Sequence, residues 1–206
     1  MILKALMVDV DGVVVHPAEH PDWTARLEAD LGVSPRILRE AFFAPHWRDI
    51  VLGRAGLHEC LGPVLAKAAP TLTSQALADY WFAKDSRLDQ ALLAEIDKVR
   101  AKGIQTHLVT VQEHERAHYL WEVLGLKDHF DAIHYSARLG AVKPEPAFFA
   151  AVEQDCGFSP EALFYIDDQP ANVAAARARG WPATVWTGER RLNDLLAEAG
   201  VSLAAG

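Results

Sequence analysis

Five charged side chains stand out in this sequence because of the residues around them: Asp9, Asp11, Lys143, Asp167 and Asp168. Each pair of aspartates follows a short apolar run, and the lysine lies in a loop between two such runs. Aspartate can serve as a nucleophile, as a proton donor or as a ligand of a hard cation. Lysine can balance the negative charge of a phosphate group. Brought together, these residue types would suit phosphoryl transfer.

Taken one at a time, these residues have ordinary structural roles, because Asp is common in turns and helix caps. Taken together, four carboxylates at one place would repel one another by roughly a few kcal/mol per close pair, even at an effective dielectric constant of about 20. Positive charge is therefore expected among them. Lys143 supplies one such charge, and Mg²⁺ with oxygen ligands would supply the rest.

The elements that must position these residues alternate along the chain. Apolar runs predict strands at residues 3–8, 105–111, 132–135, 162–166 and 183–186, and helical patterns lie between them at 90–102, 113–124, 146–156, 171–179 and 190–199. Such alternation is typical of a parallel sheet covered by helices on both faces, a Rossmann-like three-layer α/β fold. Ligands bind beyond the carboxyl ends of the strands in these sheets, where Asp9, Thr110 and Asp167 stand.

The segment from about residue 17 to residue 88 has a different character, with helical periodicity throughout and no strand pattern. Ser34 followed by Pro35 is typical of a helix start, and Gly32 of the end of the preceding helix. Four or five helices are expected here. The sequence thus predicts a core made of residues 1–15 and 89–206, with residues 16–88 inserted as a helical unit after the first strand.

Four motifs, in order along the chain, resemble those of the haloacid dehalogenase-like hydrolase superfamily. DVDGV follows the first strand, HLVT ends the second, GAVKPEPAFF is similar to the lysine loop, and FYIDDQPANVAAARARGW is similar to the last motif. The last one has the DDxxxN form of the phosphatase domain of soluble epoxide hydrolases and related bacterial enzymes. The resemblance covers nearly the whole chain and implies a Mg²⁺-dependent phosphatase with an inserted helical cap.

By this resemblance Asp9 is the nucleophile, which forms an aspartyl-phosphate and binds Mg²⁺ through its other oxygen. Asp11 would protonate the leaving alcohol and later deprotonate the attacking water, and its backbone carbonyl would also bind the metal. Asp168 would be the direct carboxylate ligand from the last motif. Asp167 and Asn172 would orient metal-bound water from behind it.

The same resemblance places Thr110 and nearby backbone amides against the phosphoryl oxygens, with Lys143 offsetting the charge of both phosphate and Asp9. Gly12 would permit a close approach of the backbone. One residue departs from the pattern. Many relatives have Asn after the second-motif Thr or Ser, whereas this chain has Val111, which offers the substrate a backbone amide and no side-chain hydrogen bond.

The position of the helical insertion is that of the small cap in the superfamily's first subgroup, which closes over the site and excludes water. A cap would favour a small phosphorylated metabolite, with a sugar phosphate as the guess for the substrate. Residues of the insertion that could line the closure are aromatic or basic: His16, Trp23, Phe42, Trp47, Arg48, Arg54 and Trp81.

A competing motif is HERAH, which fits the HExxH pattern of zinc proteases, with His114 and His118 one helical turn apart and Glu115 as a base. A protease would also need a third ligand and a substrate-binding edge strand, which nothing else in the sequence provides. Zinc proteolysis is therefore disfavoured.

The same superfamily fold also supports reactions different from phosphate ester hydrolysis. A 2-haloacid dehalogenase would use Asp9, but that subgroup lacks the second aspartate, so Asp11 favours a phosphatase. A phosphonatase would need a Schiff-base lysine, and neither Lys67 nor Lys84 is marked as desolvated. A sugar phosphomutase stays open, as does a binding protein without turnover.

Composition and charge indicate which classes of partner the protein is expected to have. The formal net charge of −8 and the absence of a basic run disfavour nucleic acid. Cys60 and Cys156 are far apart in a chain with two cysteines, which favours reduced thiols and a cytoplasmic location. No apolar run reaches the roughly 18 residues of a membrane helix, so no membrane partner is expected. The oligomeric state is left open.

Overall fold

A five-stranded parallel sheet forms the centre of the computed structural model, which describes residues 3–18 and 22–201. The strand order is β5-β4-β1-β6-β7. The strands are β1 (Ala5–Val8), β4 (Gln105–Thr110), β5 (Ala132–Tyr135), β6 (Leu163–Asp167) and β7 (Ala183–Val185). Since β4 and β6 flank β1, the carboxyl ends of these three strands meet at one edge.

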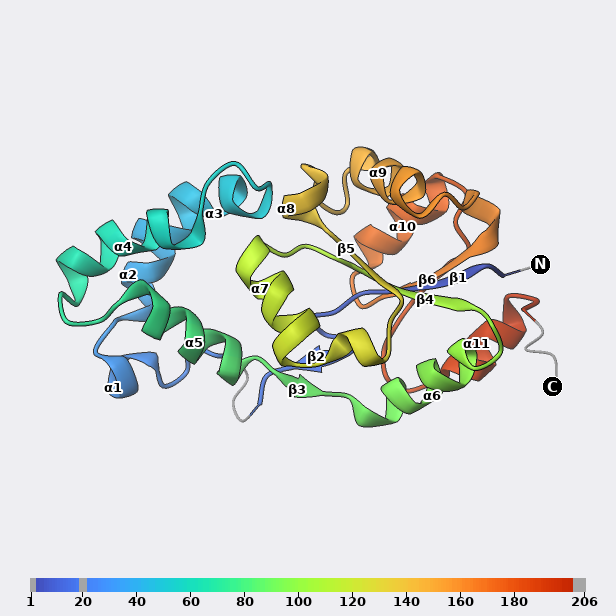
Figure 1. Cartoon of the computed structure of the whole chain (residues 1–206), viewed down its shortest axis with the longest axis horizontal. Coiled ribbons are helices and arrows are strands. Elements are labelled where there is room, and N and C mark those ends of the chain that lie inside the picture. The colour runs from blue at the N-terminus through green and yellow to red at the C-terminus, as the bar shows by residue number, and fades with distance from the viewer. Residues whose placement is uncertain (1–2, 19–21, 202–206) are drawn as a thin grey trace.

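Helices cover both faces of the sheet and complete three layers (Figure 1). Leu6 and Val8 of β1 face one layer, made of α6 (Gln90–Arg100), the continuous helix α7–η2 (His114–His118, Tyr119–Val123) and α11 (Leu192–Glu198). Ala5 and Met7 face the other layer, made of α9 (Pro146–Cys156) and α10 (Pro170–Ala178). This alternation is the period-2 pattern of a strand buried on both sides.

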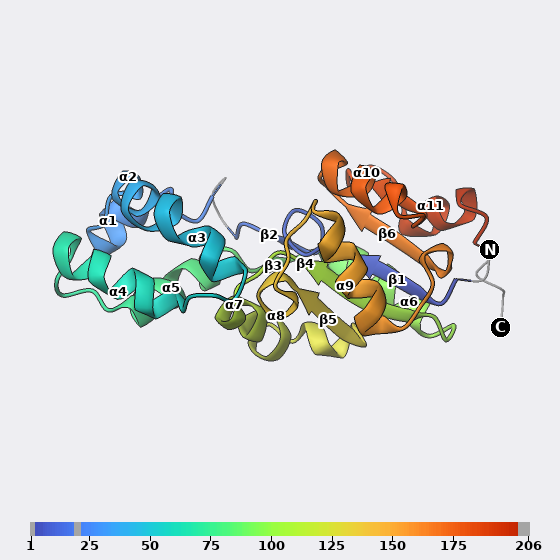
Figure 2. The ribbon, with the colours of Figure 1, turned by 90° about the horizontal axis from the view of Figure 1, so that it is seen from above.

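The segment between β1 and α6 forms a second apolar cluster of its own. Its helices are α1 (Leu27–Leu31), α2 (Pro35–Leu38), η1 (Arg39–Phe43), α3 (Ala44–Val51), α4 (Leu57–Ala68) and α5 (Ser74–Lys84), with α2, η1 and α3 running on as one helix. Two short antiparallel strands, β2 (Val15–His16) and β3 (Arg87–Leu88), carry the chain out to these helices and back. Residues 16–88 are called the helical insertion below. Figure 2 shows it at one end of the molecule.

One contact between the insertion and the core joins α3 and the loop after it to the core helix α8 (Ser136–Leu139). Gly53 has φ +70°, and a Cβ atom there would lie 2.3 Å from the backbone oxygen of Ala137. Only glycine fits such an approach in that conformation. Beside it, the Arg48 guanidinium lies 2.9 Å from the Glu145 carboxylate. The insertion is therefore seated closely against the core.

The predicted fold class is confirmed, and the helix start at Pro35 after a left-handed Gly32 is also confirmed, although the Ser34 side chain makes no capping hydrogen bond. Boundaries differ by one or two residues. The predicted strand at 162–166 is β6, which ends at Asp167 because that residue still pairs with Val185 of β7. The ribbon of β2 and β3 and the short helix α8 were not predicted. No helix among the described residues has the length and apolar character needed to cross a membrane.

Candidate active site

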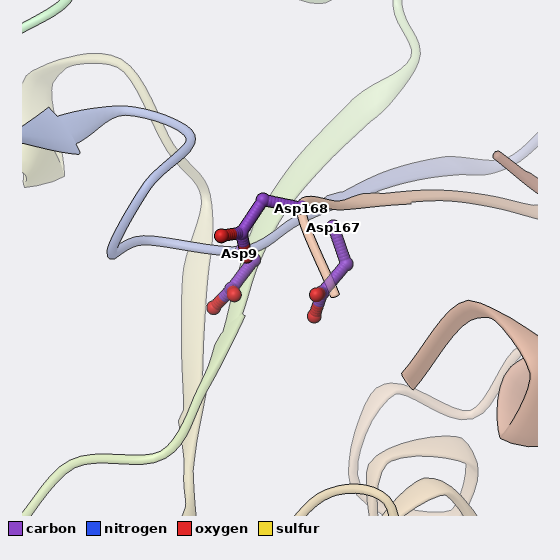
Figure 3. Close-up of side chains that lie close together, drawn as sticks. All are labelled: Asp9, Asp167 and Asp168. Atoms are coloured by element: carbon purple, nitrogen blue, oxygen red, sulfur yellow. The ribbon is translucent and has the colours of Figure 1, made fainter. Parts of the chain in front are cut away.

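Three carboxylates gather at the carboxyl ends of β1 and β6, as Figure 3 shows. One oxygen from each of Asp9, Asp167 and Asp168 lies within 4.8 Å of the others. They adjoin a cavity of about 350 Å³. Its lining residues come from the core: Asp9, Asp11, Gly12, Thr110, Val111, Lys143, Asp168, Gln169 and Asn172. The structure thus brings together the residues that the four sequence motifs supply.

Asp9 is the most buried acid that opens on this cavity, with 6% of its surface exposed. Its Oδ1 atom accepts a hydrogen bond from the backbone N–H of Val10 and lies 2.7 Å from the Lys143 ammonium. Burial raises the pKa of the Asp9 carboxyl to about 7, against the opposing effect of Lys143, and the charge of Asp167 adds to the rise. More positive charge in the cavity would favour the ionised form of Asp9.

Lys143 contacts four of the buried polar groups at this site. Its ammonium lies 2.7 Å from carboxylate oxygens of both Asp9 and Asp167 and donates to the Val109 carbonyl and the Tyr165 hydroxyl at 3.1 Å. Burial alone would lower the pKa of Lys143, but the two carboxylates outweigh it and raise the pKa. The lysine therefore stays charged between two acids that would otherwise repel each other.

The adjacent acids Asp167 and Asp168 have different surroundings. Asp167 is fully buried, and its two oxygens accept hydrogen bonds from Lys143, Tyr165, Asn172 and the backbone N–H of Gln169. Burial opposes ionisation of Asp167, but Lys143 and these donors lower its pKa overall. Asp168 is partly exposed to the cavity and accepts one side-chain hydrogen bond, from Gln169 at 2.8 Å. Asp168 thus keeps free oxygen lone pairs for a cation, whereas those of Asp167 are largely used.

Gly12 makes room for Asp168. Its φ is +79°, and a Cβ atom at this position would lie 2.6 Å from Asp168 Oδ2. The backbone after β1 therefore approaches the β6 acid more closely than any side chain would allow. Substitution of Gly12 would displace Asp168 from the cluster.

The Asp11 carboxylate lies outside the group of three acids and has partners of its own. Its Oδ2 atom accepts a 2.6 Å hydrogen bond from Gln112 Nε2, and its Oδ1 atom lies 4.0 Å from Arg116. The side chain is 52% exposed and lines the cavity. Desolvation by the cavity walls raises the pKa of Asp11, while Arg116 opposes the rise. The arrangement suits a group that exchanges a proton, and only the backbone carbonyl of Asp11 is left for the metal role that the resemblance implies.

Thr110 ends β4, the strand beside the central β1, and Val111 begins the loop beyond it. Thr110 is buried, and its hydroxyl accepts a 3.3 Å hydrogen bond from Gln112 Nε2. Val111 lines the cavity and packs against a cluster formed by Val142 of the core with Val51 and Leu52 of the insertion. The apolar side chain that replaces the usual Asn therefore makes an apolar contact with the insertion.

None of the seven residues considered for closure lines the cavity, and neither does any other residue in the described part of the insertion. Trp23, Phe42, Trp47 and Trp81 belong to an aromatic cluster inside the insertion, in which Trp23 and Trp81 stack with ring centroids 5.0 Å apart. Arg48 and Arg54 face acids, and His16 lies in β2.

Sequence reasoning missed four residues of the site: Tyr165, Gln169, Gln112 and Arg116. Tyr165 could have been found, because it stands two residues before Asp167 on a strand and so shares its face. Gln112 and Arg116 had no comparable signal.

The HERAH motif, of which Arg116 is the middle residue, does not form a metal site. His114 lies 3.3 Å from the hydroxyl of Tyr135, and Glu115 lies 2.6 Å from His58. Within the described residues, no histidine belongs to a group of side chains able to hold a metal.

Residues 3–180 match the family model of haloacid dehalogenase-like hydrolases. The chain belongs to this family. This haloacid dehalogenase-like hydrolase is also 26% identical over 208 residues to a phosphoglycolate phosphatase of Rhodospirillum rubrum, with 88% of this chain and 78% of the relative covered.

Solved structures share the fold of this haloacid dehalogenase-like hydrolase. A HAD family enzyme from Bacteroides thetaiotaomicron, solved as a magnesium complex, superposes with a TM-score of 0.78 at 18% identity, covering 95% of this chain and 99% of that chain. A HAD-like family hydrolase from Porphyromonas gingivalis has a TM-score of 0.77 at 22% identity and covers 98% of this chain and 100% of that chain.

Proposed function

We propose that this hydrolase is a Mg²⁺-dependent phosphatase of small phosphomonoesters that works through an aspartyl-phosphate on Asp9. The observation that carries the proposal is that two acids two residues apart, Asp9 and Asp11, reach the same cavity with different surroundings. Asp9 is buried and paired with Lys143, whereas Asp11 lines the same cavity and accepts a hydrogen bond from Gln112. A hydrolase that forms and breaks an acyl-phosphate needs both a nucleophile and a separate proton donor.

In the first half-reaction, an Asp9 oxygen attacks phosphorus, the bond between phosphorus and the leaving oxygen breaks, and Asp11 gives its proton to the leaving alcohol. In the second, Asp11 takes a proton from water, the resulting hydroxide attacks phosphorus, and the bond to Asp9 breaks to release phosphate. Lys143 balances charge on Asp9 and the phosphoryl group. Thr110 and the backbone N–H groups beyond β4 would bind phosphoryl oxygens.

A divalent cation fits the residues present. Once all three are ionised, Asp9, Asp167 and Asp168 carry three negative charges beside the ammonium of Lys143. All are hard oxygen ligands of the kind Mg²⁺ prefers. We assign direct contact with the cation to Asp9, Asp168 and the Asp11 backbone carbonyl. Asp167 and Asn172 would orient water bound to the cation without contacting it. When bound, Mg²⁺ would supply positive charge for the phosphoryl group during transfer.

The substrate is proposed to be small because the cavity holds about 350 Å³. Val111, which lines this cavity, also packs against the insertion, which would act as the cap. The Rhodospirillum rubrum relative is a phosphoglycolate phosphatase, and a HAD family structure holds magnesium and inorganic phosphate. Both support a phosphomonoester as the substrate class. A sugar phosphate remains one class to screen.

The test is hydrolysis of an aryl phosphate by purified protein with Mg²⁺, with chelator and with Zn²⁺, beside the Asp9→Asn variant. Phosphate release that needs Mg²⁺ and disappears in Asp9→Asn is the expected result. Release that survives in Asp9→Asn would contradict the covalent mechanism. Halide release from a 2-haloacid without metal would favour the dehalogenase reaction instead.

A further inference from the structure

Arg116 is a buried cation without a role in the reaction outlined above. It lies on α7, which begins where the Glu113 carboxylate accepts hydrogen bonds from the backbone N–H groups of Glu115 and Arg116. Its side chain is 3% exposed. Burying a guanidinium is costly unless it is paired and hydrogen-bonded, so the partners of Arg116 indicate what it is for.

One set of partners belongs to the helical insertion. The Arg116 guanidinium donates hydrogen bonds to the backbone carbonyls of Phe82, at 3.2 Å, and of Asp85. Both carbonyls lie at the end of α5, immediately before β3 leads the chain back to the core. The guanidinium also lies 5.3 Å and 5.5 Å from the ring centroids of Phe82 and Tyr119. Arg116 thus fastens the end of α5 to the core.

The other partners of the guanidinium are two acids. Arg116 Nη2 lies 3.9 Å from Asp85 Oδ2 and 4.0 Å from Asp11 Oδ1. The remaining Asp11 oxygen accepts the hydrogen bond from Gln112, which stands four residues before Arg116. The stretch from Gln112 to Arg116 therefore faces both oxygens of the Asp11 carboxyl group.

The geometry points to Arg116 as a positioning residue that links the seating of the helical insertion to the orientation of Asp11. This inference rests on the proposed function, in which Asp11 is the proton donor. The insertion joins the core through β2 and β3. Movement about this ribbon would withdraw the Phe82 and Asp85 carbonyls and release the guanidinium to turn. Asp11 is then aligned with the leaving group only while the insertion is seated.

The test uses leaving groups of different acidity. A nitrophenyl leaving group departs without a proton, whereas an alkyl alcohol needs one, so misplacing the proton donor should harm alkyl phosphates selectively. Arg116→Lys and Arg116→Gln should lower kcat for an alkyl phosphate by roughly ten- to a hundred-fold and for nitrophenyl phosphate by at most about three-fold. Arg100→Lys is the matched control, because Arg100 also donates to a backbone carbonyl, that of Asp128, and pairs with an acid, Asp131.

Two further measurements separate the contact with Asp11 from the contact with the end of α5. Gln112→Leu removes the 2.6 Å hydrogen bond to Asp11 and the longer one, 3.3 Å, to Thr110, and it leaves the contacts with α5 in place. It should therefore show the same selective loss for the alkyl phosphate, beyond any loss that both substrates share. Hydrogen exchange of the backbone amides of residues 84–88 should accelerate in the Arg116 variants and stay at the wild-type rate in Gln112→Leu. If the Arg116 variants do not fold, Gln112→Leu still tests the positioning of Asp11.

The outcomes that overturn the inference are distinct from failure of the proposed function. Equal loss of kcat for both substrates in the Arg116 variants would show a general structural role. Unchanged exchange at residues 84–88 would show that Arg116 does not hold the insertion. Wild-type protein that hydrolyses neither phosphate would refute the proposed function, and the exchange measurement would still decide the link to the insertion.

Discussion

The core and the helical insertion bury different kinds of side chain. The buried polar or charged residues among those described all lie in the core: Asp9, Thr106, His107, Thr110, Gln112, Glu113, Arg116, His134, Ser136, Asp167 and Asn172. The side chain of Lys143 is buried there as well. The residues buried within the described part of the insertion are apolar, from Leu27 to Phe82.

Burying polar groups is costly unless each finds a partner. In the core, hydrogen bonds and ion pairs at the strand ends offset this cost, as those of Lys143 with Asp9, Asp167 and Tyr165 do. The same networks contain the groups able to do chemistry. The insertion has an ordinary apolar interior. Its influence on the reaction must therefore pass through the places where it contacts the core, among them those at Gly53, Val111 and Arg116.

The sharpest test of this division removes the nucleophile. Asp9→Asn should lower phosphate release by at least about four orders of magnitude, because no aspartyl-phosphate can form. The fold should persist, since the substitution keeps the shape and removes a charge that burial disfavours. Steady-state kinetics and thermal unfolding of the same preparation check both expectations. Comparable turnover in Asp9→Asn would move the chemistry away from this acid.

Removing the charge at the centre of the core network should affect both activity and stability. Lys143→Ala leaves Asp9 and Asp167 buried without their shared cation, which should cost about 3–5 kcal/mol of unfolding free energy. Activity should fall by roughly two to three orders of magnitude. Denaturant unfolding and phosphate release provide the two measurements. A variant as stable as wild type would show that the carboxylates do not depend on Lys143.

The buried core histidines should make stability depend on acid. Burial lowers the pKa of His107 to about 4, and the nearby His134 adds to this lowering. The unfolded chain takes up a proton near the ordinary value of 6.5, so acid favours unfolding. The contribution of His107 is complete above that pH and is lost as pH falls toward 4.

This loss amounts to about 3 kcal/mol. Urea unfolding at several pH values should show it, and His107→Gln should flatten the dependence in that window. An unchanged slope in His107→Gln would assign the acid sensitivity to other groups.

The smallest effect is expected where the insertion touches the core. Gly53→Ala should reduce stability by roughly 1–2 kcal/mol and lower turnover several-fold, because the new Cβ meets the Ala137 oxygen and the backbone is left-handed. Gly32→Ala is the control, since Gly32 has φ +69° and nothing within 4 Å of an added Cβ. If both variants lose turnover equally, the seating at Ala137 does not matter for the reaction.

Much of the fold followed from local pattern. A four-residue strand such as β1 is apolar on both faces because both are covered, and this pattern is visible in the sequence. Parallel strands bring their carboxyl ends to one edge, so the convergence of Asp9, Lys143 and Asp168 could be predicted without knowing any distance. The division of residues 16–88 from the core stays a prediction about folding units, although their helices are as expected.

Tertiary structure alone decided which of these groups hold one another. The hydrogen bond between Gln112 and Asp11 joins residues 101 positions apart, and no periodicity signals such a pair. Arg116 is a second example, because the sequence shows it only as the middle residue of HERAH and gives no sign of its hydrogen bonds to the end of α5. Side-chain contacts depend on the rotation and approach of packed elements, whereas the pattern of buried and exposed positions is written locally in the sequence. The sequence by itself determined the sheet and the residues at its edge, and packing decided their partners.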